Sequence, residues 1–457
     1  MTYPDLVIRS HRVLTAQGVI PAAVCVSHGV VTAILGIDAI IALPAEAEAG
    51  GTHRDVRLAP DEVLIPGLVD THVHVNEPGR TEWEGFASAT LAAAAGGVTT
   101  IIDMPLNSIP PTVSVPALER KRRAAGSKVS VDVGFWGGAI PENLGRLREL
   151  HDAGVFGFKV FLSPSGVEEF PHLTLEQLHA AAVEIAAFGG QLLVHAEDPQ
   201  VLHAAANGGG DGYGDFVASR PPEAETTAIE HVIDVVRRTG VRAHILHLSS
   251  ARSLPLLRAA KEAGLSITAE TCPHYLYFAA ECIPDGGTSY KCCPPIRDEA
   301  NRELLWAGLG DGTIDFVASD HSPATRELKL GHGGDFGLAW GGISGLQLSL
   351  AAVWTAARGR GVALEQVVEW MSTAPARFIG LTGKGHIALG AAADLVAFAP
   401  TEQFLVDAET LRHKNKVTAF DGTVLVGRVQ TTWLAGRDVF STSDDVAGIP
   451  TGSLLMR

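Results

Sequence analysis

The sequence predicts an α/β fold: a (β/α)8 barrel of the TIM type, with a small β-sandwich domain built from both chain ends. From residue 63 onward, short apolar runs alternate with Ala/Leu-rich helical patterns. There are eight such runs, which is the number of strands that closes a parallel barrel. At both ends of the chain the runs are instead short, alternating and broken by turn residues, as in antiparallel sheets.

The expected barrel strands are the runs rich in Val, Ile and Phe. They span 63–72, 97–104, 128–136, 155–162, 191–196, 241–248, 265–272 and 313–320. The clearest helical patterns between them span 81–95, 174–188 and 250–263. Each strand is therefore followed by a helix or loop that returns the chain to the same end of the sheet.

Start and stop signals flank the helical patterns. Thr81 with Glu84, and Thr174 with Gln177, have the spacing of capping boxes. Glycines stand where helices should end, at positions 96, 126, 154, 189, 240 and 264. An open doubly wound sheet is the alternative, but it predicts a glycine-rich phosphate loop after the first strand. The sequence there, VDTHVHVNEPG, is not one.

We therefore expect two domains in three segments. Residues 1–60 form the first part of the small β domain, residues 61–384 form the (β/α)8 barrel, and residues 385–457 complete the β domain. The Gly-rich patch 207–215 is expected to be a mobile loop over the barrel mouth.

Composition favours a freely soluble globular protein. The chain has 457 residues, of which 46% are hydrophobic and 19% charged, enough to bury a large core. A net charge of −16 argues against nucleic acid and anionic lipid as partners. The N-terminus lacks a signal-peptide pattern, and five cysteines without a CxxC pair suit a reducing compartment, so we expect a cytoplasmic location. The longest uncharged stretches, 85–102 and 340–357, contain Gly, Ser or Thr and are expected to be buried elements rather than membrane spans.

Ionisable residues gather at the ends of the predicted strands. They are His72, His74, Lys159, His195, His247 and Asp320. In a barrel these carboxyl-terminal ends meet on one rim, where barrel enzymes build their active sites. Because successive side chains of a strand point to opposite faces, His72 and His74 lie on one side of the first strand, where both can reach one ion.

Each of these residues also has a purely structural interpretation. His195 alone would more often be a hydrogen-bonded core histidine, and Asp320 alone would cap the following helix. His247 competes with His244, which points to the other face of its strand and lies farther from its end. Four histidines and an aspartate on one rim are nevertheless difficult to explain without a metal.

Lys159 is unusual because it lies inside an apolar strand. Burial lowers the pKa of a lysine unless an acid pairs with it. A neutral amine can add carbon dioxide to give a carbamate, whose two oxygens could bridge two cations. Without the surrounding histidines, Lys159 would be interpreted as an ion-pair residue.

With these motifs, the sequence resembles the cyclic amidohydrolases of the amidohydrolase superfamily from end to end. The resemblance lies in PGLVDTHVH, the FK lysine, HAED, HLSS, ETCPHYL, ASDH and GHIALGAAADLV. It implies a barrel with two divalent metals, usually zinc with cobalt, nickel, manganese or iron as alternatives, bridged by a carboxylated Lys159. It further implies that His72, His74 and Asp320 hold one ion, that His195 and His247 hold the other, and that the enzyme is a homotetramer.

Within this family the sequence is most similar to the allantoinase subgroup. The similar segments are HVHVNEPGRTEWEGF, DMPLNSIPPT, KCCPPIRD and GGISGLQ. Asn76 stands where dihydroorotases have the arginine that holds a substrate carboxylate, so we expect no cation for a carboxylate in the pocket. Pro164 stands where dihydropyrimidinases have a tyrosine, and Cys293 stands where a serine is expected.

The resemblance implies hydrolysis of the ring amide of allantoin to allantoate, with Asp320 as the group that moves the proton. Asn76, Asn107 and His321 are the expected substrate contacts. The alternative within the same class is a dihydropyrimidinase or hydantoinase acting on another cyclic amide. An alternative of another class is a non-catalytic barrel that serves as an assembly protein, which the complete ligand set disfavours.

Overall fold

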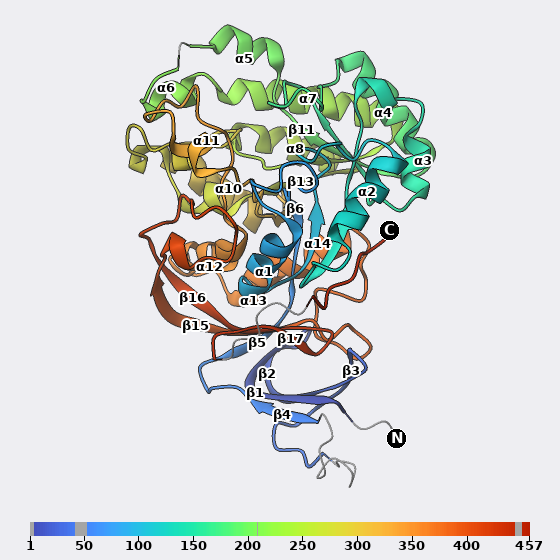
Figure 1. The fold of residues 1–457 in the computed structure, drawn as a ribbon, viewed down its shortest axis with the longest axis vertical. Coiled ribbons are helices and arrows are strands. Elements are labelled where there is room, and N and C mark those ends of the chain that lie inside the picture. The colour runs from blue at the N-terminus through green and yellow to red at the C-terminus, as the bar shows by residue number, and fades with distance from the viewer. Residues whose placement is uncertain (1–3, 42–52, 208, 444–449) are drawn as a thin grey trace.

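The computed structural model describes residues 4–41, 53–207, 209–443 and 450–457. Two units lie one above the other in Figure 1. Helices around parallel strands form the larger unit, and a sheet built from N-terminal and C-terminal strands forms the smaller one. Position 208 of the Gly-rich patch and positions 42–52 of the first β segment lie outside the described residues.

The barrel strands run parallel and belong to two sheets, ordered β6-β7-β8 and β9-β10-β11-β12-β13-β14. A bridge between Val73 and His321 joins the first strand to the residues that follow the last, and His74 N donates to His321 O at 2.8 Å. The strands are β6 (Leu68–Val73), β7 (Val98–Asp103), β8 (Asp132–Phe135), β9 (Gly137–Gly138), β10 (Phe158–Phe161), β11 (Gln191–His195), β12 (Arg242–Ile245), β13 (Ile267–Thr271) and β14 (Phe316–Val317). The predicted barrel is confirmed, with β8 and β9 together in the position of the third strand.

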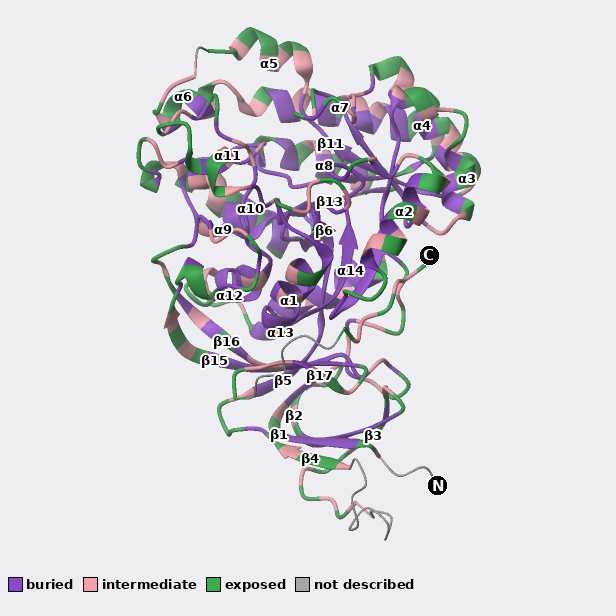
Figure 2. Cartoon of the chain, viewed as in Figure 1, coloured by how far each residue is buried: buried purple, intermediate pink, exposed green. Residues whose placement is uncertain are grey.

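Helices surround these strands. They are α1 (Phe86–Ala95), α2 (Val115–Ala125), α3 (Leu147–Asp152), α4 (Leu175–Ala187), α5 (Pro199–Ala205), α6 (Tyr213–Ala218), α7 (Pro222–Thr239), α8 (Leu254–Glu262), α9 (Pro273–Tyr277), α10 (Glu299–Gly310), α11 (Arg326–Leu330), α12 (Ser349–Arg358), α13 (Leu364–Val368) and α14 (Ala374–Phe378). Their inner faces and the strands are buried, while their outer faces are exposed (Figure 2). No helix of the described residues is long and apolar enough to cross a membrane.

Both chain ends contribute to one eight-stranded sheet, ordered β17-β16-β15-β5-β1-β2-β3 with β4 paired to β1. Its strands are β1 (Leu6–Thr15), β2 (Gly18–Ser27), β3 (Val30–Leu35), β4 (Arg54–Arg57), β5 (Val63–Pro66), β15 (Leu395–Leu405), β16 (Val424–Leu434) and β17 (Arg437–Ser441). The last residues turn back to the barrel, where Val133 N donates to Ser453 O at 2.9 Å and Leu455 N to Val133 O at 2.8 Å. The domain boundaries at 60/61 and 384/385 remain a prediction.

Two local predictions were wrong. The run 63–72 is not one strand, because β5 pairs with β15 in the sheet of the chain ends and only β6 belongs to the barrel. The capping box at Thr81 and Glu84 does not form: α1 begins at Phe86, and its N-cap, Gly85, makes no side-chain capping bond. Instead, the Glu77 carboxylate accepts from Phe86 N at 2.9 Å. The Thr174–Gln177 capping box of α4 is confirmed.

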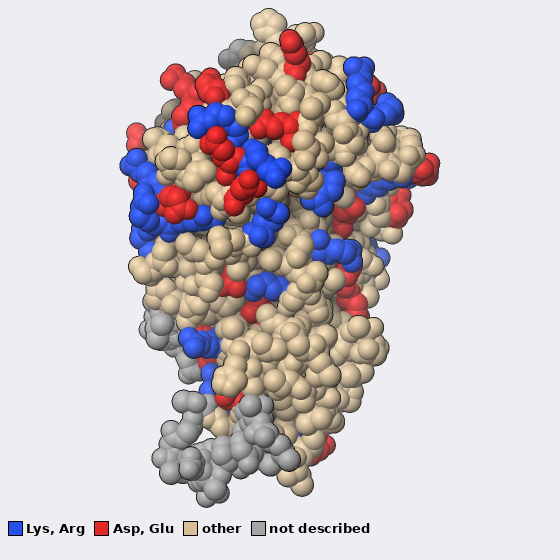
Figure 3. All heavy atoms as spheres, turned by 90° about the vertical axis from the view of Figure 1, so that its right-hand side faces the viewer, with Lys and Arg blue, Asp and Glu red and all other residues tan. Residues whose placement is uncertain are grey.

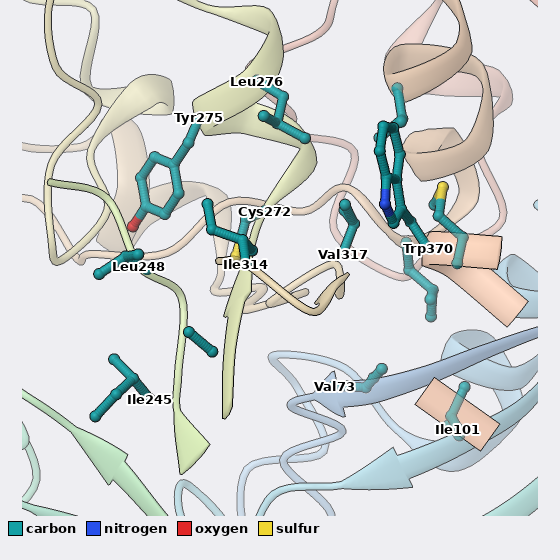
Figure 4. Packing of buried hydrophobic residues seen from close by; sticks show 14 of the residues in the cluster. Val73, Ile101, Ile245, Leu248, Cys272, Tyr275, Leu276, Ile314, Val317 and Trp370 are labelled. Atoms are coloured by element: carbon teal, nitrogen blue, oxygen red, sulfur yellow. The ribbon is translucent and has the colours of Figure 1, made fainter. Parts of the chain in front are cut away.

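The main apolar core packs the barrel strands against the surrounding helices. Figure 4 shows Val73 and Ile101 from neighbouring strands, with Ile245 and Cys272 from the opposite side. These residues are at most 1% exposed and belong to one cluster. This packing of strands against helices fixes the strand ends, so polar side chains just beyond them are held in place.

Charged residues of both signs are interspersed on the barrel part of the face in Figure 3, and fewer lie on its lower part. The five cysteines, all within the described residues, form no disulfide.

Candidate active site

Six predicted residues converge on the carboxyl-terminal rim of the barrel. His72 lies near the end of β6 with His74 just beyond it, Lys159 lies in β10, and His195 is the last residue of β11. His247 and Asp320 follow β12 and β14. All six are buried.

His72, His74 and Asp320 form a first candidate metal position. Their ligand atoms all lie within 4.8 Å of one another. Asp320 Oδ1 is 3.1 Å from His72 Nε2 and 3.5 Å from His74 Nε2. His72 Nε2 is buried without a hydrogen-bond partner, which a cation at this point would remedy.

His195 and His247 form a second candidate position. His195 Nδ1 lies 2.9 Å from His247 Nε2. Two neutral imidazoles present lone pairs to each other only where a proton or a cation lies between them. Residues that fit metal ligands therefore occur at both positions.

Lys159 lines the same cavity as His74, His195, His247 and Asp320. Burial lowers the pKa of Lys159 to about 8, although the nearby Asp320 and Glu270 carboxylates act to raise it. Among the described residues, Lys159 Nζ has no hydrogen bond or ion pair; it lies 4.8 Å from the Phe161 ring centroid. The predicted ion-pair alternative therefore finds no partner here.

The histidines are held in the neutral form that binds metals. Burial lowers the pKa of His74 to about 4, and it also lowers the pKa values of His72, His195 and His247. Burial raises the pKa of Asp320, but the surrounding histidines outweigh it and hold the pKa well below its usual value. Asp320 is therefore a carboxylate that is available as a ligand and as a proton acceptor.

Two carboxylates that the sequence reasoning missed orient these histidines. Glu270, in β13, accepts from His72 Nδ1 and lies 3.1 Å from His244 Nε2. With Nδ1 in contact with Glu270, the other ring nitrogen of His72, Nε2, is directed toward Asp320. The signal was present, because Glu270 is a charged residue inside a buried apolar strand.

Glu197 makes the corresponding contact at the second position. Its Oε2 lies 2.7 Å from His195 Nε2, and Arg220 Nε donates to Oε1 at 3.0 Å. Burial raises the pKa of Glu197, but Arg220 and His195 outweigh it and lower the pKa to about 2. The HAED motif contained Glu197, whereas nothing in the sequence around Arg220 marked it.

The backbone is strained at several of these positions. Asn76, Asn107, His247 and Asp320 have φ of 65°, 65°, 36° and 45°, in the left-handed region that non-glycine residues rarely adopt. Such conformations persist where surrounding structure fixes them, and they cluster at functional sites.

The rim residues open into a cavity of about 340 Å³. Its wall includes Asn107, Pro164, Arg220, Lys291 and Cys293, and the segment 337–342. The expectation that the pocket offers no cation was wrong, because Arg220 and Lys291 line it. The sequence did not reveal them because both come from loops that are distant in sequence from the HxH motif.

Asn76 and His321 lie elsewhere. Asn76 is fully buried and its Nδ2 donates to Pro323 O at 3.2 Å. His321 is also fully buried, and its Nδ1 accepts from Gly345 N at 3.2 Å. Neither is among the residues that line the cavity. Of the three expected substrate contacts, only Asn107 faces the space that a substrate would occupy.

Comparisons with known proteins agree with this geometry. The model of the amidohydrolase family matches residues 63–439. The allantoinase of Streptomyces avermitilis is 55% identical over the whole length of both chains, and that of Arabidopsis thaliana is 43% identical over 95% of this chain and 87% of its own. The solved L-hydantoinase (dihydropyrimidinase) from Arthrobacter aurescens superposes with a TM-score of 0.92 at 30% identity, covering 99% of this chain and 100% of its own.

Proposed function

This chain belongs to the amidohydrolase family, and from that membership we propose how its rim residues hydrolyse the ring amide of allantoin to allantoate. The observation that supports allantoin as the substrate is the 55% identity to an allantoinase over both full chains. The resemblance to the allantoinase subgroup is confirmed.

We propose that His72, His74 and Asp320 hold one divalent ion and that His195 and His247 hold another. Lys159 would be a further ligand as a carbamate, because its pKa of about 8 leaves part of the amine neutral near neutral pH and able to add carbon dioxide. When bound, the ions would lower the pKa of a water molecule and act as Lewis acids toward the substrate carbonyl. Zinc is the proposed metal.

The chain's own groups then handle the proton and the substrate. Asp320 accepts a proton during the attack and returns it to the departing ring nitrogen. Asn107 presents an amide, which both donates and accepts hydrogen bonds, to the ureido arm. Asn76 and His321 act instead by fixing the loops beside Asp320. A homotetramer and a cytoplasmic location complete the proposal.

Substrate choice is tested by comparing allantoin with hydantoin, dihydrouracil and dihydroorotate on one metal-loaded preparation. A site shaped for a polar arm leaves its own groups unpaired, at about 1–3 kcal/mol each, when the arm is absent. We expect the highest kcat/KM for allantoin. If hydantoin or dihydrouracil reacted faster, the substrate would be another cyclic amide, and no turnover of any of the four would favour the non-catalytic alternative.

The metal centre is tested by elemental analysis and chelation. The expected content approaches two divalent ions per chain, and removal of the ions should abolish turnover. Full activity with less than one ion per chain would exclude the bridged pair.

A further inference from the structure

A continuous chain of contacts runs from the cavity wall to His195. Arg220, which lies between α6 and α7, donates from Nε to Glu197 Oε1 at 3.0 Å and from Nη2 to Oε2. Glu197 Oε2 also lies 2.7 Å from His195 Nε2. The Glu197 side chain is fully buried, whereas 21% of the Arg220 side chain is exposed, and Arg220 lines the cavity.

This arrangement determines which imidazole nitrogen carries the hydrogen. A carboxylate held by a guanidinium only accepts hydrogen bonds, so His195 Nε2 must be the donor. His195 Nδ1 is then left as a lone pair, and it is the atom that lies 2.9 Å from His247 Nε2. Rotation or tautomer exchange of this ring would move the lone pair away from the second position.

The two candidate metal positions differ in how their orienting carboxylates are held. Glu270 lies between His72 Nδ1 and His244 Nε2, inside the barrel. Glu197 is held from the cavity wall by Arg220, an arginine whose planar fork fits both carboxylate oxygens. The second position therefore depends on a residue distant in sequence from every proposed ligand.

We propose that Arg220 and Glu197 are positioning residues for the second metal position. Arg220 fixes the Glu197 carboxylate, and Glu197 fixes His195 as the Nε2–H tautomer with Nδ1 directed toward the ion. This inference extends the proposed metal pair, and it assigns neither residue a bond to substrate in the reaction.

The first readout uses metal-free protein, so it does not depend on the proposed reaction. Nitrogen chemical shifts of ¹⁵N-labelled histidines, assigned with a His195→Gln variant, report the tautomer of His195. We expect Nε2–H in the wild-type chain and a mixture of tautomers in Glu197→Gln. A wild-type His195 with its hydrogen on Nδ1 would overturn the proposal.

The second readout is metal retention in Glu197→Gln, Arg220→Lys and Arg220→Met. Loss of a partner that orients a metal ligand typically weakens metal binding roughly 10–100-fold. Dialysis of these variants against a weak chelator should therefore lower the metal content from two ions per chain to one. Arg220→Lys keeps the charge but not the fork, and should fall between Arg220→Met and wild type. Lys384→Met is the matched control, because Lys384 is also a partly buried cation paired with carboxylates, Asp132 and Asp394, and contacts none of the proposed ligands.

Two outcomes would overturn the inference. One is retention of both ions with wild-type affinity in Glu197→Gln and Arg220→Met. The other is a raised KM with unchanged metal content in Arg220→Met alone, which would make Arg220 a substrate contact. Wild-type protein that binds no ions would instead contradict the proposed function, while the tautomer measurement would still be decisive for the Glu197–His195 contact.

Discussion

At the scale of single residues, the site combines groups whose ordinary chemistry has been altered by burial. Lys159 has a pKa of about 8 and no polar partner among the described residues, while Asp320 is held as a carboxylate by histidines. Both pKa values are lowered, which makes part of the Lys159 amine neutral and keeps Asp320 able to accept a proton. Two predictions belong to this scale.

Replacing Lys159 with Ala tests the bridge. We expect metal content and activity to fall together, because alanine has no amine that could form the carbamate. Short carboxylic acids should restore part of both by occupying the vacated space. Elemental analysis and turnover with and without added acetate check this, and full activity without additive would show that Lys159 is structural.

Replacing Asp320 with Asn tests proton transfer. The amide keeps the shape and an oxygen ligand but accepts a proton poorly, so kcat should fall by roughly 10²–10⁴-fold. Near-ultraviolet circular dichroism should match that of the wild type, since Asp320 lies on the rim and outside the apolar core. An unchanged kcat would assign the proton to another group.

At the scale of elements, the cavity wall depends on a buried lysine. Lys329, in α11, donates to Lys291 O at 2.6 Å, Trp340 O at 2.9 Å and Gly342 O at 2.6 Å. Lys291 in turn donates to Ala339 O at 2.5 Å. Carbonyl groups of the wall segment 337–342 are thus held by these two side chains, while its backbone N–H groups bond to Asp335, Leu328 and Lys291.

Lys329→Met should therefore loosen the wall and destabilise the fold. Each carbonyl left buried without a donor costs about 1–3 kcal/mol, so a loss of several kcal/mol in the free energy of unfolding is expected. KM should rise because the segment lines the cavity. Urea unfolding and steady-state kinetics measure the two effects; Lys291→Met, which removes fewer strong bonds, should change stability less.

At the scale of the whole molecule, buried neutral histidines make stability depend on pH. Burial lowers the pKa values of His244 and His413 to about 3 and that of His274 to about 4. Below pH 6.5 the unfolded chain binds protons that the folded chain does not, so the stability present above pH 6.5 is lost as the pH falls toward these values. Burial also raises the pKa of Asp70 to about 6, which acts in the opposite sense because its contribution is lost as pH rises through 6.

We expect each of these three histidines to contribute about 1.4 kcal/mol of lost stability per pH unit between pH 6.5 and 4. His413→Leu removes one of them, and both ring nitrogens of His413 are buried without a partner. Urea unfolding at pH 7.5, 6.5 and 5.5 should give a shallower slope for this variant than for the wild type. Equal slopes would show that His413 is charged in the folded chain.

The sequence by itself determined the barrel, the second β unit from both chain ends and the candidate ligands, because each leaves a local pattern. Alternating strands and helices follow from hydrophobic periodicity, and a ligand at a strand end needs only its own strand to place it. The family followed from motifs within single segments, and the comparisons confirm it.

Only the tertiary structure decided which partners complete the site. Glu270 contacts His72 at a separation of 198 residues, and Arg220 contacts Glu197 at a separation of 23 residues. Asn76 lies at the position where the motif predicts a substrate contact. Its side-chain amide instead donates to the backbone carbonyl of Pro323, 247 residues away. The orientation, the burial and the pKa of a side chain depend on neighbours that the chain brings together only on folding. The hydrophobic periodicity of the sequence does not predict these neighbours.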